Sequence, residues 1–375
     1  MLIEFTDDFI NQLNKMEYLD NVWLLLNNIL HNTLHYHHIV FATIQGIEML
    51  LGSNEIDNSN KKVLGWIKNK IQDLNALKNK VKIILRLSFV SSSKKQEDNK
   101  TIYYLNVYDV DEFKESVFVT ENPSDYDFYL KIAKWFLNFN NYDISISNSP
   151  SCGSNAEQVI ISNNKEEKFV YCLFDSDRDS LNAKAGDTYK NAKKGANKRV
   201  NKNYPFQLDI LEAREKENLF PFTQYINDTK IGKKERELLK LIQNESEEIQ
   251  KFFDIKDGIK KKRIRDKRYQ DWQAIYFDFI QKCEKMNLCD ICNCQKDSCR
   301  DCKDSDEEYI HGIGDKILQR VSDNFFEKYD KKITNIEIID KIFGNQHYIL
   351  LLWQSIADVI FSFGCCLSRS IKFVN

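Results

Sequence analysis

The chain has 375 residues, of which 42% are hydrophobic and 29% charged, with 24 Phe and 17 Tyr. This composition supplies a buried core and excludes a largely disordered protein, and the length predicts two or three packed units. A formal net charge of −2 excludes a polycation that binds nucleic acid by bulk charge alone. With no leader-like segment and no apolar stretch of about 18 residues, we expect a cytoplasmic protein without membrane contact.

Residues 1–114 show mainly helical patterning. The run 22–51 is apolar on most faces, and 61–77 repeats apolar residues at spacings of three and four. The polar tract 91–100 separates two β-like runs, 81–90 and 101–110. We therefore expect residues 1–114 to form a mainly helical N-terminal region with a hairpin.

The pattern changes over residues 115–227, where short apolar runs alternate with helical segments. Such alternation predicts an α/β core with a mostly parallel sheet covered by helices. Strands are expected at 116–121, 143–147, 168–175 and 205–211, and a helix at 125–139.

Residues 228–375 return to helical patterning. This region is expected to be a helical C-terminal region with a Cys-rich insertion at 283–302. The apolar stretch 351–369 favours a core helix or an oligomer helix, so a homo-oligomer stays open. Helices are expected at 233–253, 268–286, 315–329 and 347–363.

Carboxylates follow two of the predicted strands directly. Glu121 ends the strand 116–121, and Asp175 and Asp177 come at the end of 168–175. Because the carboxyl ends of parallel strands lie along one edge of a sheet, we expect these side chains to meet there. Mg²⁺ or Mn²⁺ prefers carboxylate and water oxygens, and bound metal can activate water and neutralise phosphate charge. Glu121 is then a ligand or a base, and the aspartates are ligands.

These two segments together resemble the TOPRIM domain of topoisomerases, primases and nucleases, in which a glutamate follows one strand and Asp-x-Asp a later one. The resemblance extends to Asp125 and the pair Phe128-Tyr129, as in the "EGxxDxxFY" variant of the OLD nuclease group and related phage-defence proteins. Asn122 stands where that variant has glycine, which makes the turn less permissive. By the resemblance, Asp125 joins the metal site.

The segment 211–221 is similar to the "REIENY" segment that follows Asp-x-Asp in this subset. By position, Glu215 and Glu217 are candidates for a second metal or for shaping the site. The resemblance implies a Mg²⁺- or Mn²⁺-dependent endonuclease that cuts DNA or RNA, including tRNA, as the effector of a bacterial anti-phage or abortive-infection system. It also implies a separate ABC-type ATPase partner, because this chain has no Gly-x-x-x-x-Gly-Lys-Ser/Thr loop.

Three other interpretations compete with this one. Asp175, Asp177 and Asp179 could form only a solvated loop. A strand that ends in Asp-x-Asp is also typical of haloacid-dehalogenase phosphatases, whose first aspartate is a nucleophile, although here a glutamate-bearing strand precedes the motif. Finally, a degenerate TOPRIM fold could serve as a non-catalytic binding or regulatory subunit.

Basic residues follow the Asp-x-Asp segment closely. Phosphates gain Coulomb attraction and counterion release beside such residues, so we expect them to bind nucleic acid. A second basic run occupies 260–268, and for both runs a solvated helix face is the competing interpretation. The residues of the first run are Lys190, Lys193, Lys194, Lys198, Arg199 and Lys202.

Two Cys-x-x-Cys pairs occur close together, Cys289/Cys292 and Cys299/Cys302. Thiolates at this paired spacing can hold a structural Zn²⁺ tetrahedrally. The short separation between the pairs equally fits a reduced, Cys-rich loop, so both interpretations stay open.

Overall fold

A computed structural model describes residues 1–16, 19–110, 112–137, 141–265, 269–289, 307–314, 316–330 and 333–371. The chain forms two compact units. Unit 1 comprises Met1–Leu173, Asn191–Asp209 and Gln354–Asn375, and unit 2 comprises Phe174–Lys190 and Ile210–Trp353. These boundaries differ from the three consecutive regions predicted, because each unit is assembled from segments that are far apart in the sequence.

The first sheet of unit 1 has five strands in the order β2-β1-β3-β5-β4. β1, β2, β3 and β5 run parallel, and β4 is antiparallel to β5. The N-terminal region is therefore helical only in part, because five of its segments form this sheet. The buried strands β1 and β2 were not predicted. Its elements are β1 (Leu2–Phe5), α1 (Asp7–Leu13), α2 (Asp20–Leu34), β2 (Ile39–Ala42), α3 (Ile44–Gly52), α4 (Asn58–Asn69), α5 (Ile71–Lys80), β3 (Ile83–Ser88), β4 (Ser93–Glu97) and β5 (Lys100–Asn106).

The predicted hairpin is made of other segments than expected. β3 and β5 are parallel neighbours and cannot form a hairpin with each other. Instead, the polar tract itself supplies β4, which turns at Asp98-Asn99 into β5. Both turn residues have positive φ, 46° and 62°, as a tight two-residue hairpin turn of the mirror-image type requires.

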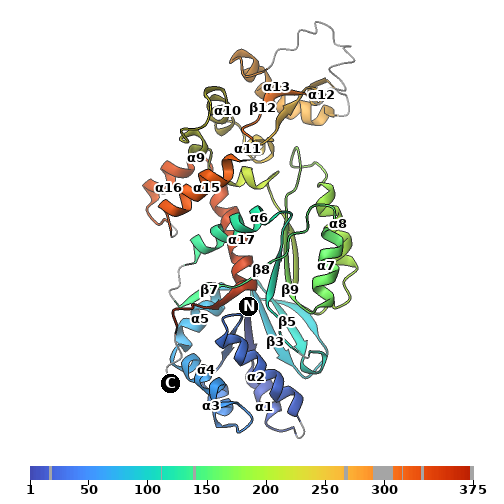
Figure 1. The fold of residues 1–375 in the computed structure, drawn as a ribbon, viewed down its shortest axis with the longest axis vertical. Coiled ribbons are helices and arrows are strands. Elements are labelled where there is room, and N and C mark those ends of the chain that lie inside the picture. The colour runs from blue at the N-terminus through green and yellow to red at the C-terminus, as the bar shows by residue number, and fades with distance from the viewer. Residues whose placement is uncertain are drawn as a thin grey trace. The chain divides into compact units, whose positions relative to one another are not determined.

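The second sheet of unit 1 has the strand order β10-β9-β6-β8, and β6 is parallel to both of its neighbours. Phe118 of β6 packs against Tyr126 and Tyr129 of α6, while α7 and α8 lie along the other side of the sheet (Figure 1). The prediction of an α/β core with a mostly parallel sheet covered by helices is confirmed. The elements are β6 (Ser116–Val119), α6 (Pro123–Phe136), β8 (Ser147–Asn148), α7 (Ala156–Lys165), β9 (Phe169–Phe174), α8 (Asp187–Asn197) and β10 (Phe206–Ile210).

One predicted strand, 143–147, is divided between two sheets. β7 (Tyr142–Ile144) pairs antiparallel with β13 (Cys365–Leu367), whereas β8 joins β6 in the four-stranded sheet. β7 therefore finds its partner more than 200 residues further along the chain, which the local pattern does not indicate.

Unit 2 is mainly helical and carries one small antiparallel sheet of β11 (Gly258–Lys260) and β12 (Glu308–His311). One described helix, α17 (His347–Gly364), whose residues from Gln354 onward belong to unit 1, has the length and composition to cross a bilayer, and 56% of its residues are buried. A buried core helix passes the same test. The other helices are η2 (Lys216–Leu219), α9 (Phe222–Ile226), α10 (Lys233–Gln243), α11 (Glu247–Phe252), α12 (Lys261–Arg265), α13 (Gln270–Lys285), α15 (Ile317–Lys328) and α16 (Ile336–Phe343).

Candidate functional site

Glu121 lies in unit 1, two residues after the end of β6. The backbone beside it is fixed because Ser151 N donates to Thr120 O at 2.8 Å and Cys152 N donates to Glu121 O at 3.0 Å. Cys152 and Gly153 then turn through positive φ, 48° and 70°. A Cβ on Gly153 would lie 3.7 Å from Glu121 Oε1, so the glutamate carboxylate lies over this turn.

Asp125 caps the helix that follows Glu121. Its Oδ2 accepts a hydrogen bond from Asn122 N at 2.9 Å, and the two residues form a capping box at the start of α6. Asn122 has φ of −129°, so the position does not need the left-handed conformation that glycine favours. Asp125 is buried and has a clear structural role, and its role as a metal ligand stays a prediction.

Asp175 and Asp177 lie in unit 2, in the loop that follows β9. Ser176 N and Asp177 N both donate to the carbonyl oxygen of Arg214, at 2.9 and 3.0 Å. Asp177 adopts a positive φ of 52°. A Cβ on Gly186 would collide with the Asp177 carboxylate, so only glycine allows this close approach.

The side chain of Arg214 organises the carboxylates of unit 2. Its buried guanidinium pairs with Asp179, with Asp254 at 2.8 Å and with Glu215 at 3.3 Å, and Arg263 adds a second bond to Asp179 at 2.7 Å. Burial opposes the charge of Arg214, but the three carboxylates outweigh it and raise its pKa. No local sequence pattern indicates the role of Arg214, because its partners Asp179 and Asp254 are distant in sequence.

Three predicted carboxylates of unit 2 have raised pKa values, in each case mainly because of burial. The pKa of Asp177 rises although Arg214 and Lys256 lower it. The pKa of Glu215 is also raised, although the ammonium of Lys256 lies 3.3 Å from its Oε2. Burial and the charge of Glu215 raise the pKa of Glu217 to about 7. A bound cation would favour the ionised form of such groups.

The donor chemistry of the predicted metal ligands fits a hard cation, since all of them are carboxylates. Glu121 belongs to unit 1, while Asp175, Asp177, Glu215 and Glu217 belong to unit 2. Within the described ranges, no three His, Cys, Asp or Glu side chains gather as a metal-binding group. Glu215 has cationic partners in Arg214 and Lys256, which makes it a weaker candidate than the aspartates.

The first basic run is largely helical, because Lys190, Lys193 and Lys194 lie on α8. Lys190 pairs with Asp187 one turn earlier at 2.8 Å. The segment is thus a charged helix face and a short connection rather than an extended flexible loop. Its exposed lysines are Lys190, Lys193, Lys194, Lys198 and Lys202.

Two members of the basic run have partners within unit 1. Lys198 pairs with Glu157 of α7 at 2.7 Å, and the Arg199 guanidinium lies 3.8 Å from the ring centroid of Phe206. The stacked, half-buried Arg199 is therefore used in packing. Of the second run, residues 266–268 lie outside the described residues.

The cysteine cluster falls mostly outside the described residues, since Cys292, Cys299 and Cys302 all lie there. Cys289 is buried and forms an isolated bridge with Ile310. A hydrogen bond with Cys289, followed by burial, raises the pKa of Cys283, which favours the neutral thiol. Structural zinc stays a prediction.

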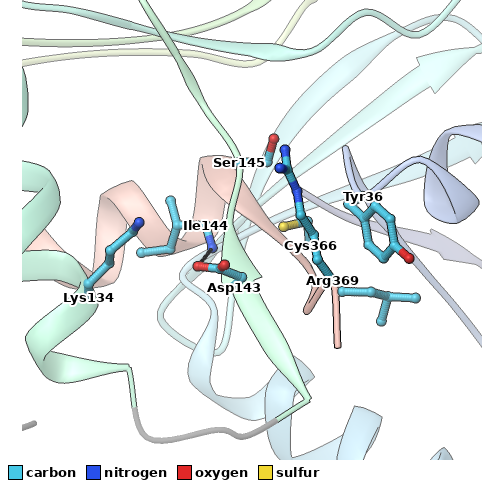
Figure 2. Close-up of a pocket in the computed structure, with 8 residues that line it drawn as sticks. Tyr36, Lys134, Asp143, Ile144, Ser145, Cys366 and Arg369 are labelled. Carbon is cyan, nitrogen blue, oxygen red and sulfur yellow. Dashed lines mark hydrogen bonds between the residues drawn. The ribbon is translucent and has the colours of Figure 1, made fainter. Parts of the chain in front are cut away.

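Unit 1 also contains a cavity of about 300 Å³ beside the β7–β13 pair (Figure 2). It contains none of the predicted site residues, and no local sequence pattern indicates it, because its walls come from segments distant in the chain. Figure 2 shows Lys134 and Arg369 on opposite sides of Ile144. Its charged and polar lining residues are Tyr36, Lys134, Asp143, Ser145 and Arg369.

No family model, curated protein or solved structure matches this chain. The structural class of the chain is therefore taken from its own fold and residues. It is an α/β protein whose parallel strands β6 and β9 each run into carboxylates.

Proposed function

We propose that this chain is a metal-dependent nuclease with a TOPRIM-like core that hydrolyses phosphodiester bonds of DNA or RNA. One observation carries the proposal. β6 and β9 are adjacent parallel strands, with Val119 paired to Cys172, so their carboxyl ends share one edge of the sheet. Glu121 follows the first strand and Asp175 the second, which is the order that a strand-end metal site requires.

Glu121, Asp175 and Asp177 would hold Mg²⁺ or Mn²⁺, with Glu121 as ligand or base. Such an ion supplies activated water and neutralises charge on the attacked phosphate. The chain's own contribution is to orient the carboxylates. The carbonyl oxygen of Arg214 accepts from Asp177 N, and the Cys152–Gly153 turn supports Glu121, whose carbonyl oxygen accepts from Cys152 N.

The exposed lysines of α8 support a polyanionic substrate. Lys193 and Lys194 lie on the exposed face of the helix and can contact phosphates without breaking an ion pair in the described structure. By the same resemblance, we propose an anti-phage effector controlled by a separate ABC-type ATPase.

The test is cleavage of plasmid DNA, single-stranded DNA and total tRNA with Mg²⁺, Mn²⁺ or EDTA. Glu121→Gln, Asp175→Asn and Asp177→Asn should each lose at least about 100-fold in rate. Asp127→Asn, at an exposed position of α6, is the matched control and should cut normally. Cutting that survives in all three site variants, or in EDTA, overturns the proposal.

A second readout covers a restrained enzyme that does not cut alone. Mn²⁺ binding, followed by electron paramagnetic resonance, should be present in the wild-type chain and in Asp127→Asn and reduced in Asp177→Asn. A chain that neither binds Mn²⁺ nor cuts would instead favour a binding subunit. That candidate is supported by the ion pairs of Glu215 with Arg214 and Lys256, which neutralise one of the predicted ligands.

A further inference from the structure

The first sheet of unit 1 has a point at which its strand order reverses. β1 is central, β2 lies on one side of it and β3 on the other, and all three strands are parallel. The connections from β1 to β2 and from β2 to β3 therefore leave in opposite directions. In open parallel sheets, a crevice forms outside the carboxyl ends of the strands at such a point, and ligands bind there.

A cavity of about 330 Å³ occupies this position. Thr6, directly after β1, lines it together with Ser88 and Phe89 at the end of β3. This volume lies within the range of roughly 300–1,000 Å³ that is usual for small-molecule sites. The cavity belongs entirely to unit 1 and shares no residue with the proposed nuclease site.

Aromatic side chains form one wall of the cavity. The rings of Phe9 and Phe89 stack with centroids 5.0 Å apart and an interplanar angle of 22°. Tyr104 adds a third ring, and Val90 beside them is 67% exposed. A flat, partly exposed apolar wall of this kind favours a planar ring system, which can stack on an aromatic face.

The charges of the cavity are distributed unevenly. Arg86 is bound by Glu4 at 2.7 Å and by Glu97 at 2.8 Å, so its charge is compensated. Lys95 is exposed, and its ammonium lies 5.0 Å from the ring centroid of Tyr104. Asp8 lines the cavity from α1. Lys95 therefore provides a local cation for a single anionic group.

We propose that this cavity binds a nucleoside monophosphate, with the base against Phe89 and the phosphate near Lys95. The residues after β1 argue against a longer phosphate chain. Thr6, Asp7 and Asp8 include no glycine and carry two carboxylates, which would repel a di- or triphosphate at that loop. The hydroxyls of Ser88 and Ser93 can bond the base or the sugar.

The test is calorimetric titration of the full chain with AMP, GMP, CMP and UMP, and with adenosine and inorganic phosphate as partial ligands. At least one monophosphate should bind more tightly than either partial ligand. Lys95→Gln should weaken that monophosphate about tenfold and leave adenosine unchanged. Phe89→Leu should weaken both the monophosphate and adenosine.

Lys94→Gln is the matched control, because Lys94 is the neighbouring residue on β4 and points to the other face, with its ammonium 5.1 Å from the ring centroid of Tyr103. It should bind like the wild type. No monophosphate binding at millimolar concentration, or equal effects of the two lysine substitutions, overturns the proposal. Glu121→Gln should bind normally, so failure of the nuclease assignment is distinguishable from failure of this one.

Discussion

Arg214 is the residue on which the interior charge balance of unit 2 depends. It is paired with Asp179, Asp254 and Glu215, and its side chain is only 8% exposed. Removing one partner of a buried ion pair leaves uncompensated charge, so Arg214→Met should lower the free energy of unfolding by about 3–5 kcal/mol. Urea denaturation measures this loss.

The control is Lys240→Met, which breaks an exposed pair with Glu237 on the same unit. Exposed pairs contribute little, and the expected change is within about 0.5 kcal/mol. Similar small changes in the two variants would contradict the role assigned to Arg214.

Asp209 makes the stability of unit 1 depend on pH. Burial raises its pKa, although hydrogen bonds from Gln207 and Tyr171 partly offset this. The folded chain therefore holds the proton more tightly than the unfolded chain, whose Asp has a pKa of about 3.9. Stability should fall as pH rises from this value through the folded pKa, and the loss should persist above it.

Asp209→Asn removes this titration. Its stability relative to the wild type should increase as pH rises above about 4, then level off, when measured by urea denaturation at a series of pH values. Leu24→Ala, at a 61% exposed position of α2, removes no ionisable group and should show a flat difference. A flat difference for Asp209→Asn as well would show that burial does not perturb this group.

At the scale of elements, two helical glycines should respond to alanine with opposite signs. A Cβ on Gly195 of α8 would lie 2.9 Å from the Cα and carbonyl oxygen of Glu157, whereas nothing lies within 4 Å of one on Gly65 of α4. Alanine gains about 1 kcal/mol of helix propensity at either site. At Gly195, the backbone of α7 cannot give way, so overpacking costing about 1–3 kcal/mol should outweigh this gain.

Thermal denaturation of the two variants provides the comparison. Gly195→Ala should melt below the wild type and Gly65→Ala above it. Stabilisation by both substitutions would mean that α7 and α8 do not pack closely at Gly195.

The turn of the β4–β5 hairpin is strained at non-glycine residues. Asn99 has φ of 62°, a region that glycine occupies freely and asparagine tolerates. Asn99→Gly should therefore raise the unfolding free energy by a few tenths of a kcal/mol, and Asn99→Ala should lower it by about 1 kcal/mol. Urea denaturation should rank the unfolding free energies as Asn99→Gly above the wild type and the wild type above Asn99→Ala. An Asn99→Ala protein more stable than the wild type would contradict the positive φ of this turn.

The elements that the sequence predicted well are those with a strong local pattern. α6, β6 and β9 lie where the alternation of apolar runs placed them. β1 and β2 were missed because a four-residue buried strand has no periodicity that distinguishes it from a helix in an apolar run. The β4 strand was read as a connection, because its solvated residues carry no apolar alternation.

The candidate site shows the same division. The positions of Glu121 and Asp175 after neighbouring parallel strands could be predicted, since they depend on local pattern and on sheet geometry. Arg214 could not, because its importance comes from carboxylates brought together by the tertiary fold. The capping role of Asp125 was also missed, although its spacing from Asn122 is a recognisable capping signal.

At the scale of the whole molecule, unit 1 is completed by the end of the chain. β13 supplies the partner of β7, Ser116 Oγ donates to Phe363 O at 2.6 Å, and Lys82 N donates to Ser362 Oγ at 2.8 Å. The local sequence of residues 1–173 does not show that it needs these partners. Unit 1 should therefore lose stability when its C-terminal segment is weakened.

Phe363 tests this dependence most directly. Its buried ring stacks on Tyr171 of β9 at 5.7 Å and 17°. Phe363→Ala should cost about 3–5 kcal/mol, because it leaves a cavity beside the sheet. Hydrogen exchange should become faster at the amides of β6 and β9, which lie more than 180 residues earlier in the chain.

Leu24→Ala, at a 61% exposed position of α2 in the same unit, should change stability by no more than about 0.5 kcal/mol and leave this exchange unchanged. Unaltered protection of β6 and β9 in Phe363→Ala would mean that the sheet does not depend on the C-terminal segment, and that unit 1 is stable from its N-terminal residues alone.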